Sequence, residues 1–181
     1  MQAKLMLART ALESGHYDVA VELLDELVID GHLEATYLRS QIELKDISNA
    51  ELLENRLKLL KSCADRGHAN ALFDLYVHYD TGDGVHQNQQ LAHEYLVKAE
   101  EANHPSAKWL VGQQLLYGTG LSGVDIPRGI RLIVEAVELK SKGAMLTLAG
   151  FYESGEFGQP IDPKQAQQLR SDAASSNVIE I

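Results

Sequence analysis

Apolar residues recur along this chain at the spacing of amphipathic α-helices. Ala71, Leu72, Leu75 and Tyr79, for example, fall at intervals of one, three and four residues, which places them on one face of a helix. A short turn containing glycine follows, and a second amphipathic run begins after it. The pattern therefore predicts pairs of antiparallel helices joined by short turns. The C-terminal run VIEI is the one stretch that resembles a strand.

This helical pair is a repeat that occurs about five times. Aligned on the first small residue of each unit, the repeats start near Ala3, Ala35, Ala71, Ala107 and Ala144, so their spacings are 32, 36, 36 and 37 residues. A period of this length is typical of solenoid proteins, in which stacked units bury a shared core. We therefore predict a single all-α domain over residues 1–181, built as an α/α solenoid of about five antiparallel helix pairs.

Residues that favour helix ends mark the boundaries of the predicted helices. Glycines follow the first helix of the last three units, where a left-handed backbone conformation is expected: Gly82 and Gly84, Gly118 and Gly120, Gly155 and Gly158. Side chains that accept hydrogen bonds from free backbone N–H groups precede the second helix of these units: Asn88, Asp125 and Asp162. Ser48 and Glu51 form a capping box in the second unit.

Small residues seven positions apart follow these caps. The pairs are Ala92 and Ala99, Gly129 and Ala136, and Ala166 and Ala173. Seven residues correspond to two helical turns, so both members of a pair lie on one face and allow a neighbouring helix to approach closely. Cys63 falls in the register of Ala99 and Ala136, which predicts a small buried side chain in preference to a reactive nucleophile.

The central repeat resembles a known family. Ala71, Leu75, Tyr79, Gly82 and Gly84 spell A-x3-L-x3-Y-x2-G-x-G, and valine follows. This motif is similar to that of the Sel-one-like repeat (SLR) family, a branch of the tetratricopeptide-type α/α solenoids. The resemblance covers the whole chain, strongly over residues 71–174 and more weakly over 1–70. It implies a right-handed superhelix in which the first helix of each pair lines a concave, protein-binding face.

Charge narrows the range of partners. The chain has 16 basic and 26 acidic residues, a formal net charge of -10, and residues 10–34 contain seven acidic residues and no Lys or Arg. Such a surface repels phosphate groups, so we expect neither nucleic-acid nor anionic-membrane binding. No apolar run approaches the roughly 20 residues of a membrane span, so we expect no membrane insertion.

The N-terminal sequence and the cysteine content bear on localisation. MQAKLMLARTAL lacks the features of a secretory signal, so the chain as it stands is expected in the cytoplasm, with the bacterial periplasm or envelope as the alternative if a signal segment was removed. Cys63 is the single cysteine, which excludes an intrachain disulfide and leaves the redox compartment open.

Three patterns invite a chemical interpretation, and we reject each. Gly118, Gly120 and Gly123 spell the dinucleotide fingerprint G-x-G-x-x-G, but a predicted helix, not a strand, precedes it. Histidines 32, 68 and 104 are 36 residues apart, so successive repeats separate them by at least a helix packing distance of about 8–10 Å, too far to share an ion. Histidines 78, 86 and 93 lie in one repeat without a zinc-binding motif. We predict no catalytic, cofactor or metal site and no enzymatic activity.

Aromatic and polar positions on the first helices are the candidate binding residues. The third position of each unit holds Leu5, Tyr37, Phe73, Trp109 or Leu146. Aromatic side chains are common anchors of binding energy at interfaces. Through the resemblance, the expected partner-binding residues are Tyr37, Gln41, Phe73, Val77, Trp109, Gln113 and Tyr117. The alternative is that the third position packs between helix pairs.

The predicted function is that of an adaptor or scaffold that binds a protein or peptide. One alternative is a homo-oligomeric or envelope structural role, because the first helix presents a wide apolar set: Leu5, Met6, Leu7, Ala8, Ala11 and Leu12. A hydrolase on a repeat scaffold is the other alternative, although the cysteine-rich relatives credited with such activity carry disulfides that one cysteine cannot form.

Overall fold

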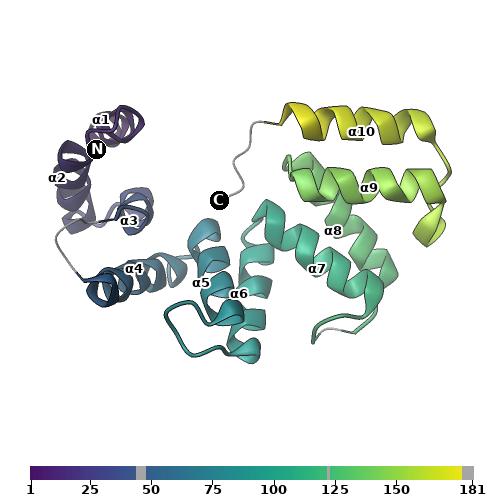
Figure 1. The fold of residues 1–181 in the computed structure, drawn as a ribbon, viewed down its shortest axis with the longest axis horizontal. Helices are drawn as coiled ribbons and strands as arrows, with labels where there is room; N and C mark the ends of the chain where they lie inside the picture. The colour runs from purple at the N-terminus through teal and green to yellow at the C-terminus, as the bar shows by residue number, and fades with distance from the viewer. Residues whose placement is uncertain (44–47, 122, 177–181) are drawn as a thin grey trace. The chain divides into compact units, whose positions relative to one another are not determined.

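The computed structural model describes residues 1–43, 48–121 and 123–176 (Figure 1). All regular secondary structure in these ranges is helical. The run VIEI lies outside them, so its predicted strand is untested. None of the helices in the described ranges is both long and apolar enough to cross a bilayer. The chain divides into two compact units, Met1–Tyr95 and Leu96–Ile181, and the division falls within helix α6 (Gln89–Glu101).

The predicted helix pairs are confirmed. The first three are α1 (Gln2–Glu13) with α2 (Tyr17–Ile29), α3 (Leu33–Ser40) with α4 (Asn49–Ala64), and α5 (Ala69–Thr81) with α6. The last two are α7 (Pro105–Tyr117) with α8 (Ile126–Glu138), and α9 (Lys142–Ser154) with α10 (Pro163–Ser175), where a short 3₁₀ helix, η1 (Glu156–Gly158), precedes α10. We call the first helix of each pair an A helix and the second a B helix.

The helix ends follow the chemistry of the sequence. Gly82, Gly118 and Gly155 cap α5, α7 and α9 with φ of 79°, 67° and 76°, the left-handed conformation that glycine adopts without steric cost. Helix α3 is followed by Gln41 instead of glycine and is only eight residues long. Asp125 accepts a hydrogen bond from the backbone N–H of Arg128 at 3.0 Å, as predicted for an N-cap. Asn88, Asp162 and Ser48 accept equivalent bonds at the starts of α6, α10 and α4.

The small residues of the B helices are buried, as expected. The pairs Ala92 and Ala99, Gly129 and Ala136, and Ala166 and Ala173 all lie in the interior. A methyl group on Gly129 would come within 2.8 Å of Cγ of Leu116 and 3.0 Å of the backbone oxygen of Gly112. The backbones of α7 and α8 therefore approach so closely that a side chain at residue 129 would collide with α7.

Each unit has its own hydrophobic core. In the first unit, one cluster joins α1, α2 and α3 around Ala8, Leu24 and Leu27. A second cluster joins α4 and α5 through Leu60 and Leu75, and Tyr79 and Tyr95 stack beside it with ring centroids 5.7 Å apart. The core of the second unit contains Leu116, Ile133, Leu148 and Phe151. Stacked helix pairs thus bury contiguous apolar surface inside each unit.

The evenly spaced histidines are N-caps of A helices. His32, His68 and His104 precede α3, α5 and α7, and Nδ1 of each accepts a hydrogen bond from the backbone N–H three residues later, at 3.3, 3.3 and 3.2 Å. Ser141 caps α9 in the same way at 3.3 Å. An Nδ1 that accepts a hydrogen bond carries no proton, so these caps require neutral imidazole rings.

Candidate protein-interaction surface

The seven predicted binding residues all belong to A helices or their ends. We call these residues, listed above, the A-helix surface, a name that covers a patch of four residues in the first unit and a patch of three in the second. Tyr37 lies on α3, and Gln41 is the residue that caps it. Phe73 and Val77 lie on α5, and the remaining three lie on α7. None is buried: Gln41, Val77 and Tyr117 are exposed, and the others are half-buried.

In the first unit, polar contacts connect the ends of consecutive A helices. Gln41 donates a hydrogen bond through Nε2 to Oδ2 of Asp74 on α5, at 3.0 Å. Burial raises the pKa of Asp74, and hydrogen bonds from Gln41 and Tyr37 oppose this rise. Asp74 is not among the binding residues predicted from the sequence. The signal was available: residue 77 is the equivalent of Gln41 one repeat of 36 later, and residue 74 lies about one turn before it on the same face of the helix.

Tyr37 also contacts the start of the next repeat. Its ring stacks on that of His68 with centroids 4.4 Å apart. The other side of the imidazole reaches α3 as well, since Nε2 of His68 lies 3.1 Å from Oε2 of Glu34. Burial raises the pKa of Tyr37, and the negative charge of Asp74 adds to the rise. The Tyr37 hydroxyl therefore stays protonated and serves as a hydrogen-bond donor.

Trp109 packs against the following A helix in the second unit. Its indole Nε1 donates to Oγ1 of Thr147 on α9 at 2.9 Å. A methyl group on Gly143 would lie 2.9 Å from the indole ring, so the ring packs directly against the backbone of α9 at this glycine. These contacts account for Trp109 as a packing residue between helix pairs, which is the alternative weighed above. Its role in partner binding stays a prediction.

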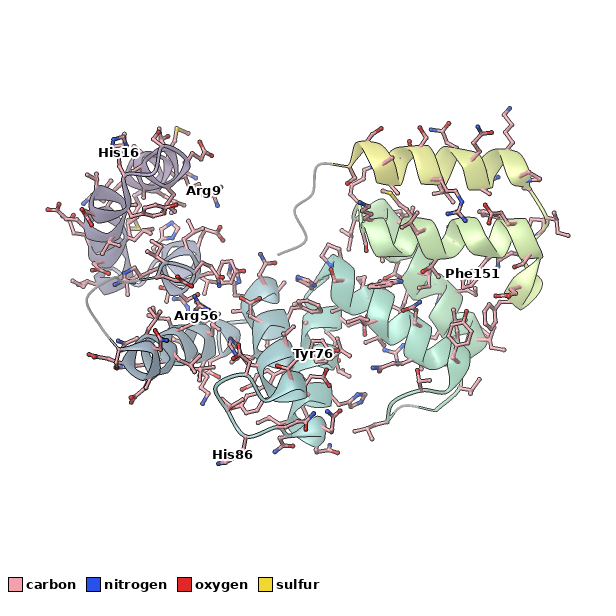
Figure 2. The ribbon with its side chains drawn as sticks, in the orientation of Figure 1. Arg9, His16, Arg56, Tyr76, His86 and Phe151 are labelled. Atoms are coloured by element: carbon pink, nitrogen blue, oxygen red, sulfur yellow. The ribbon has the colours of Figure 1, made fainter. Side chains whose placement is uncertain are left out.

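Tyr117 and Val77 project further from their helices. Tyr117 is 54% exposed, and its ring meets Phe157 edge to face at 5.4 Å. Phe157 in turn packs edge to face on Phe151, which Figure 2 shows on α9 within the second unit. The Tyr117 ring is thus held in place while half of it faces solvent. Val77 is 41% exposed on α5. An exposed but oriented ring suits an interface, because little conformational entropy is lost on binding.

An ion network with a buried centre lies in the second unit. Nζ of Lys108 on α7 lies 2.7 Å from Oε2 of Glu135 on α8 and 3.4 Å from Oε1 of Glu100 on α6. Arg128 completes the network with a contact of 3.0 Å to the other oxygen of Glu100. Lys108 is 5% exposed and Glu100 is 6% exposed. The charges balance, so the network fixes α6, α7 and α8 together. No local sequence pattern indicated this network.

The patterns rejected as chemical sites have structural roles. Cys63 is fully buried, and burial raises the pKa of its thiol to about 11, which is the opposite of an activated nucleophile. His78 is buried with Nδ1 2.8 Å from the backbone oxygen of Asp83. Gly118 caps α7, and α8 begins only at Ile126. Across the described part of the chain, His, Cys, Asp and Glu side chains form no group of three that could hold a metal ion.

Comparison with solved structures identifies the fold. A Sel1 repeat protein from Oxalobacter formigenes is similar over 97% of this chain and 71% of its own, with a TM-score of 0.76 and 20% identity. A protective antigen present in uropathogenic Escherichia coli strains, which displays an SLR fold, is similar over 87% of this chain and 33% of its own, with a TM-score of 0.66 and 22% identity. No protein-family model and no curated protein matches the sequence. The resemblance and the fold class inferred from the sequence are confirmed at the level of structure: the chain is an α/α solenoid with the Sel1-like repeat fold.

Proposed function

We propose that this chain is a non-catalytic adaptor or scaffold that binds a protein or peptide partner through the A-helix surface. The observation that supports the proposal is that none of the seven predicted residues is buried and that three of them, Gln41, Val77 and Tyr117, are exposed. Apolar and aromatic side chains such as Val77 and Tyr117 remain in contact with solvent on A helices whose other faces are packed. Exposed aromatic and aliphatic groups of this kind supply the anchors of protein interfaces.

Site-specific photocrosslinking tests the proposal. A photoreactive phenylalanine analogue placed at Val77 on α5 or at Tyr117 on α7 should form a discrete crosslinked product in cells that produce the protein. Val134 provides a matched control, because it is a valine on the B helix α8 and is 38% exposed, close to the 41% of Val77. We expect products from residues 77 and 117 and none from residue 134.

Substitutions at the same positions complete the test. Val77→Asp and Tyr117→Ala should each weaken binding of the crosslinked partner at least tenfold, because each removes an anchor from the contact. Val134→Asp should leave the affinity unchanged, and all three variants should retain the helical circular-dichroism spectrum. Crosslinking from residue 134 that equals crosslinking from residues 77 and 117 would contradict the assignment to A helices. A loss of binding confined to Val134→Asp would contradict it as well.

Self-association is a second candidate function, favoured by helix α1. Met6 is 70% exposed and Leu7 is 60% exposed on this helix, whereas Ala8 beside them is buried against the core. Light scattering after size exclusion measures the mass directly against the 20.0 kDa of one chain. A dimer that dissociates on Met6→Asp and Leu7→Asp, but persists with the exposed Ile161 changed to Asp, would support this candidate. A monomer at all concentrations would refute it.

A further inference from the structure

A pocket of about 280 Å³ opens between α2, α3 and α4 in the first unit. Its volume lies just below the range of about 300–1,000 Å³ common for small-molecule sites. Four apolar side chains form much of its wall: Val28, Ile42, Leu52 and Leu59. The pocket belongs to none of the features described above, because it is formed mainly by B helices. Because of its volume and its apolar wall, the pocket can hold an apolar group of a few carbon atoms.

Two arginines add a polar side to the same pocket. Arg39 on α3 donates through Nε to Oδ1 of Asp25 at 2.7 Å, and its side chain is only 15% exposed. Arg56 on α4 donates through Nε to the backbone oxygen of Ser40 at 3.1 Å, and Figure 2 shows it where α4 approaches α3. Both bonds use the Nε edge. Among the described residues, neither guanidinium group makes a hydrogen bond through its Nη atoms, so these four strong donors to carboxylates can serve a ligand.

The charge of the pocket is opposite to that of its surroundings. Residues 1–95 contain 8 basic and 16 acidic residues, which gives a net charge of -8. Among the described residues, the lining of the pocket contains Arg39, Arg56 and Lys58 and one carboxylate, that of Asp25, which gives a net charge of +2. Asp74 lies close enough to Arg56 for their charges to interact, so it offsets part of this excess. An anion is therefore attracted to this pocket within a unit that otherwise repels it.

We propose that this pocket binds a carboxylate attached to a short aliphatic group. The carboxylate would accept hydrogen bonds from Nη atoms of Arg39 and Arg56, and the aliphatic part would lie against the side chains of Leu52 and Leu59. Planar guanidinium groups match the geometry of a carboxylate, which a neutral amide cannot reproduce. Such a group occurs in small free acids and at the C-terminus of a peptide that ends in an aliphatic residue.

Titration followed by two-dimensional NMR of the full chain tests the proposal. We expect 4-methylpentanoate to shift the amide signals of Val28, Ile42, Leu52 and Leu59 in a saturable manner, with a Kd on the order of 1 mM for a ligand of this size. The neutral isostere 4-methylpentanamide and the short anion acetate should each bind at least tenfold more weakly. N-acetylleucine distinguishes the two sources, because tighter binding than 4-methylpentanoate identifies a peptide C-terminus and weaker binding identifies a free acid.

Arginine variants show whether the guanidinium groups cause the binding. Arg56→Gln and Arg39→Gln should each weaken 4-methylpentanoate binding about tenfold, whereas Arg131→Gln, which changes an exposed arginine on α8, should have no effect. Retained amide signals elsewhere in the spectrum show that each variant is folded. Either an amide ligand that binds as well as the acid, or arginine variants that bind like the wild type, would overturn the proposal, and so would the absence of saturable shifts. None of these results bears on partner binding at the A-helix surface.

Discussion

Acidification should destabilise the second unit through His104. This residue caps α7 with Nδ1, which accepts the backbone N–H of Ala107 and so must be unprotonated. Burial lowers the pKa of His104 from 6.5 to about 4. A proton on the ring would remove the cap, and it would also place a positive charge at the N-terminus of a helix, where the helix dipole is positive.

The difference in proton binding between the folded and unfolded chain determines how the free energy of unfolding changes with pH. The unfolded chain binds a proton at His104 near pH 6.5, but the folded chain does so only near pH 4. Between these values the unfolded state holds more protons, so the free energy of unfolding decreases as the pH falls and is fully reduced below pH 4. The difference between a pKa of 6.5 and one of about 4 corresponds to at most about 3.4 kcal/mol.

Urea unfolding between pH 7 and pH 4 measures this loss. Trp109 is the only tryptophan in the chain and lies on α7, so its fluorescence reports on the second unit. In His104→Ser the cap is retained without a titrating group, as Ser141 already demonstrates at the start of α9. We expect this variant to lose about 2–3 kcal/mol less than the wild type between pH 6.5 and pH 4. Carboxylates that titrate in this window contribute to both proteins and cancel in the difference.

His16 provides the control for this experiment. It precedes α2, but its side chain makes no capping hydrogen bond and is exposed. His16→Ser should therefore reproduce the pH dependence of the wild type. The reasoning is refuted if His104→Ser and the wild type lose the same stability on acidification, because the buried neutral cap would then contribute nothing to the pH dependence.

Two further predictions concern packing in the second unit, and both are measured by urea unfolding at pH 7. Lys108→Met should lower the free energy of unfolding by about 3–5 kcal/mol, because it leaves Glu100 buried with one of its cationic partners removed. The control, Lys164→Met on an exposed face of α10, should change the free energy of unfolding by less than about 0.5 kcal/mol. Gly129→Ala should cost about 1–3 kcal/mol, since its methyl group would collide with α7. Gly150→Ala in α9, where nothing lies within 4 Å of the added methyl, should stabilise the helix by about 0.5–1 kcal/mol, and equal effects at the two glycines would contradict the packing argument.

Local chemistry made most of the fold predictable from the sequence. A glycine at the end of an apolar helical pattern identifies the end of α5, α7 or α9 without knowledge of anything else in the chain. The same holds for Asp125 and Asp162, because an N-cap interacts with backbone groups two or three residues away. Because these local signals recur about every 36 residues, they also predict the number of helix pairs.

Features that depend on distant partners could not be predicted in this way. Lys108 on α7 contacts Glu100 on α6 and Glu135 on α8, and Arg128 on α8 contacts Glu100, so the network depends on how three helices pack. The pocket between α2, α3 and α4 depends in the same way on the separation of helices that no local pattern fixes. The histidine caps were missed for another reason: Ser, Thr, Asp and Asn are the usual N-caps, so histidine gave no recognisable signal.

The contacts of His68 show which part of the A-helix surface is free to bind a partner. One side of this ring caps α5, and the ring also stacks on Tyr37 and reaches Glu34, so it connects α5 to α3 near the start of α5. Gln41 makes a second connection between these helices through its carboxylate partner on α5. Tyr37 and Gln41 are thus already held by contacts between repeats, and a partner would have to compete with those contacts. Val77, four residues before the end of α5, is more exposed, and we therefore expect it to contribute more binding energy in the first unit than either of them.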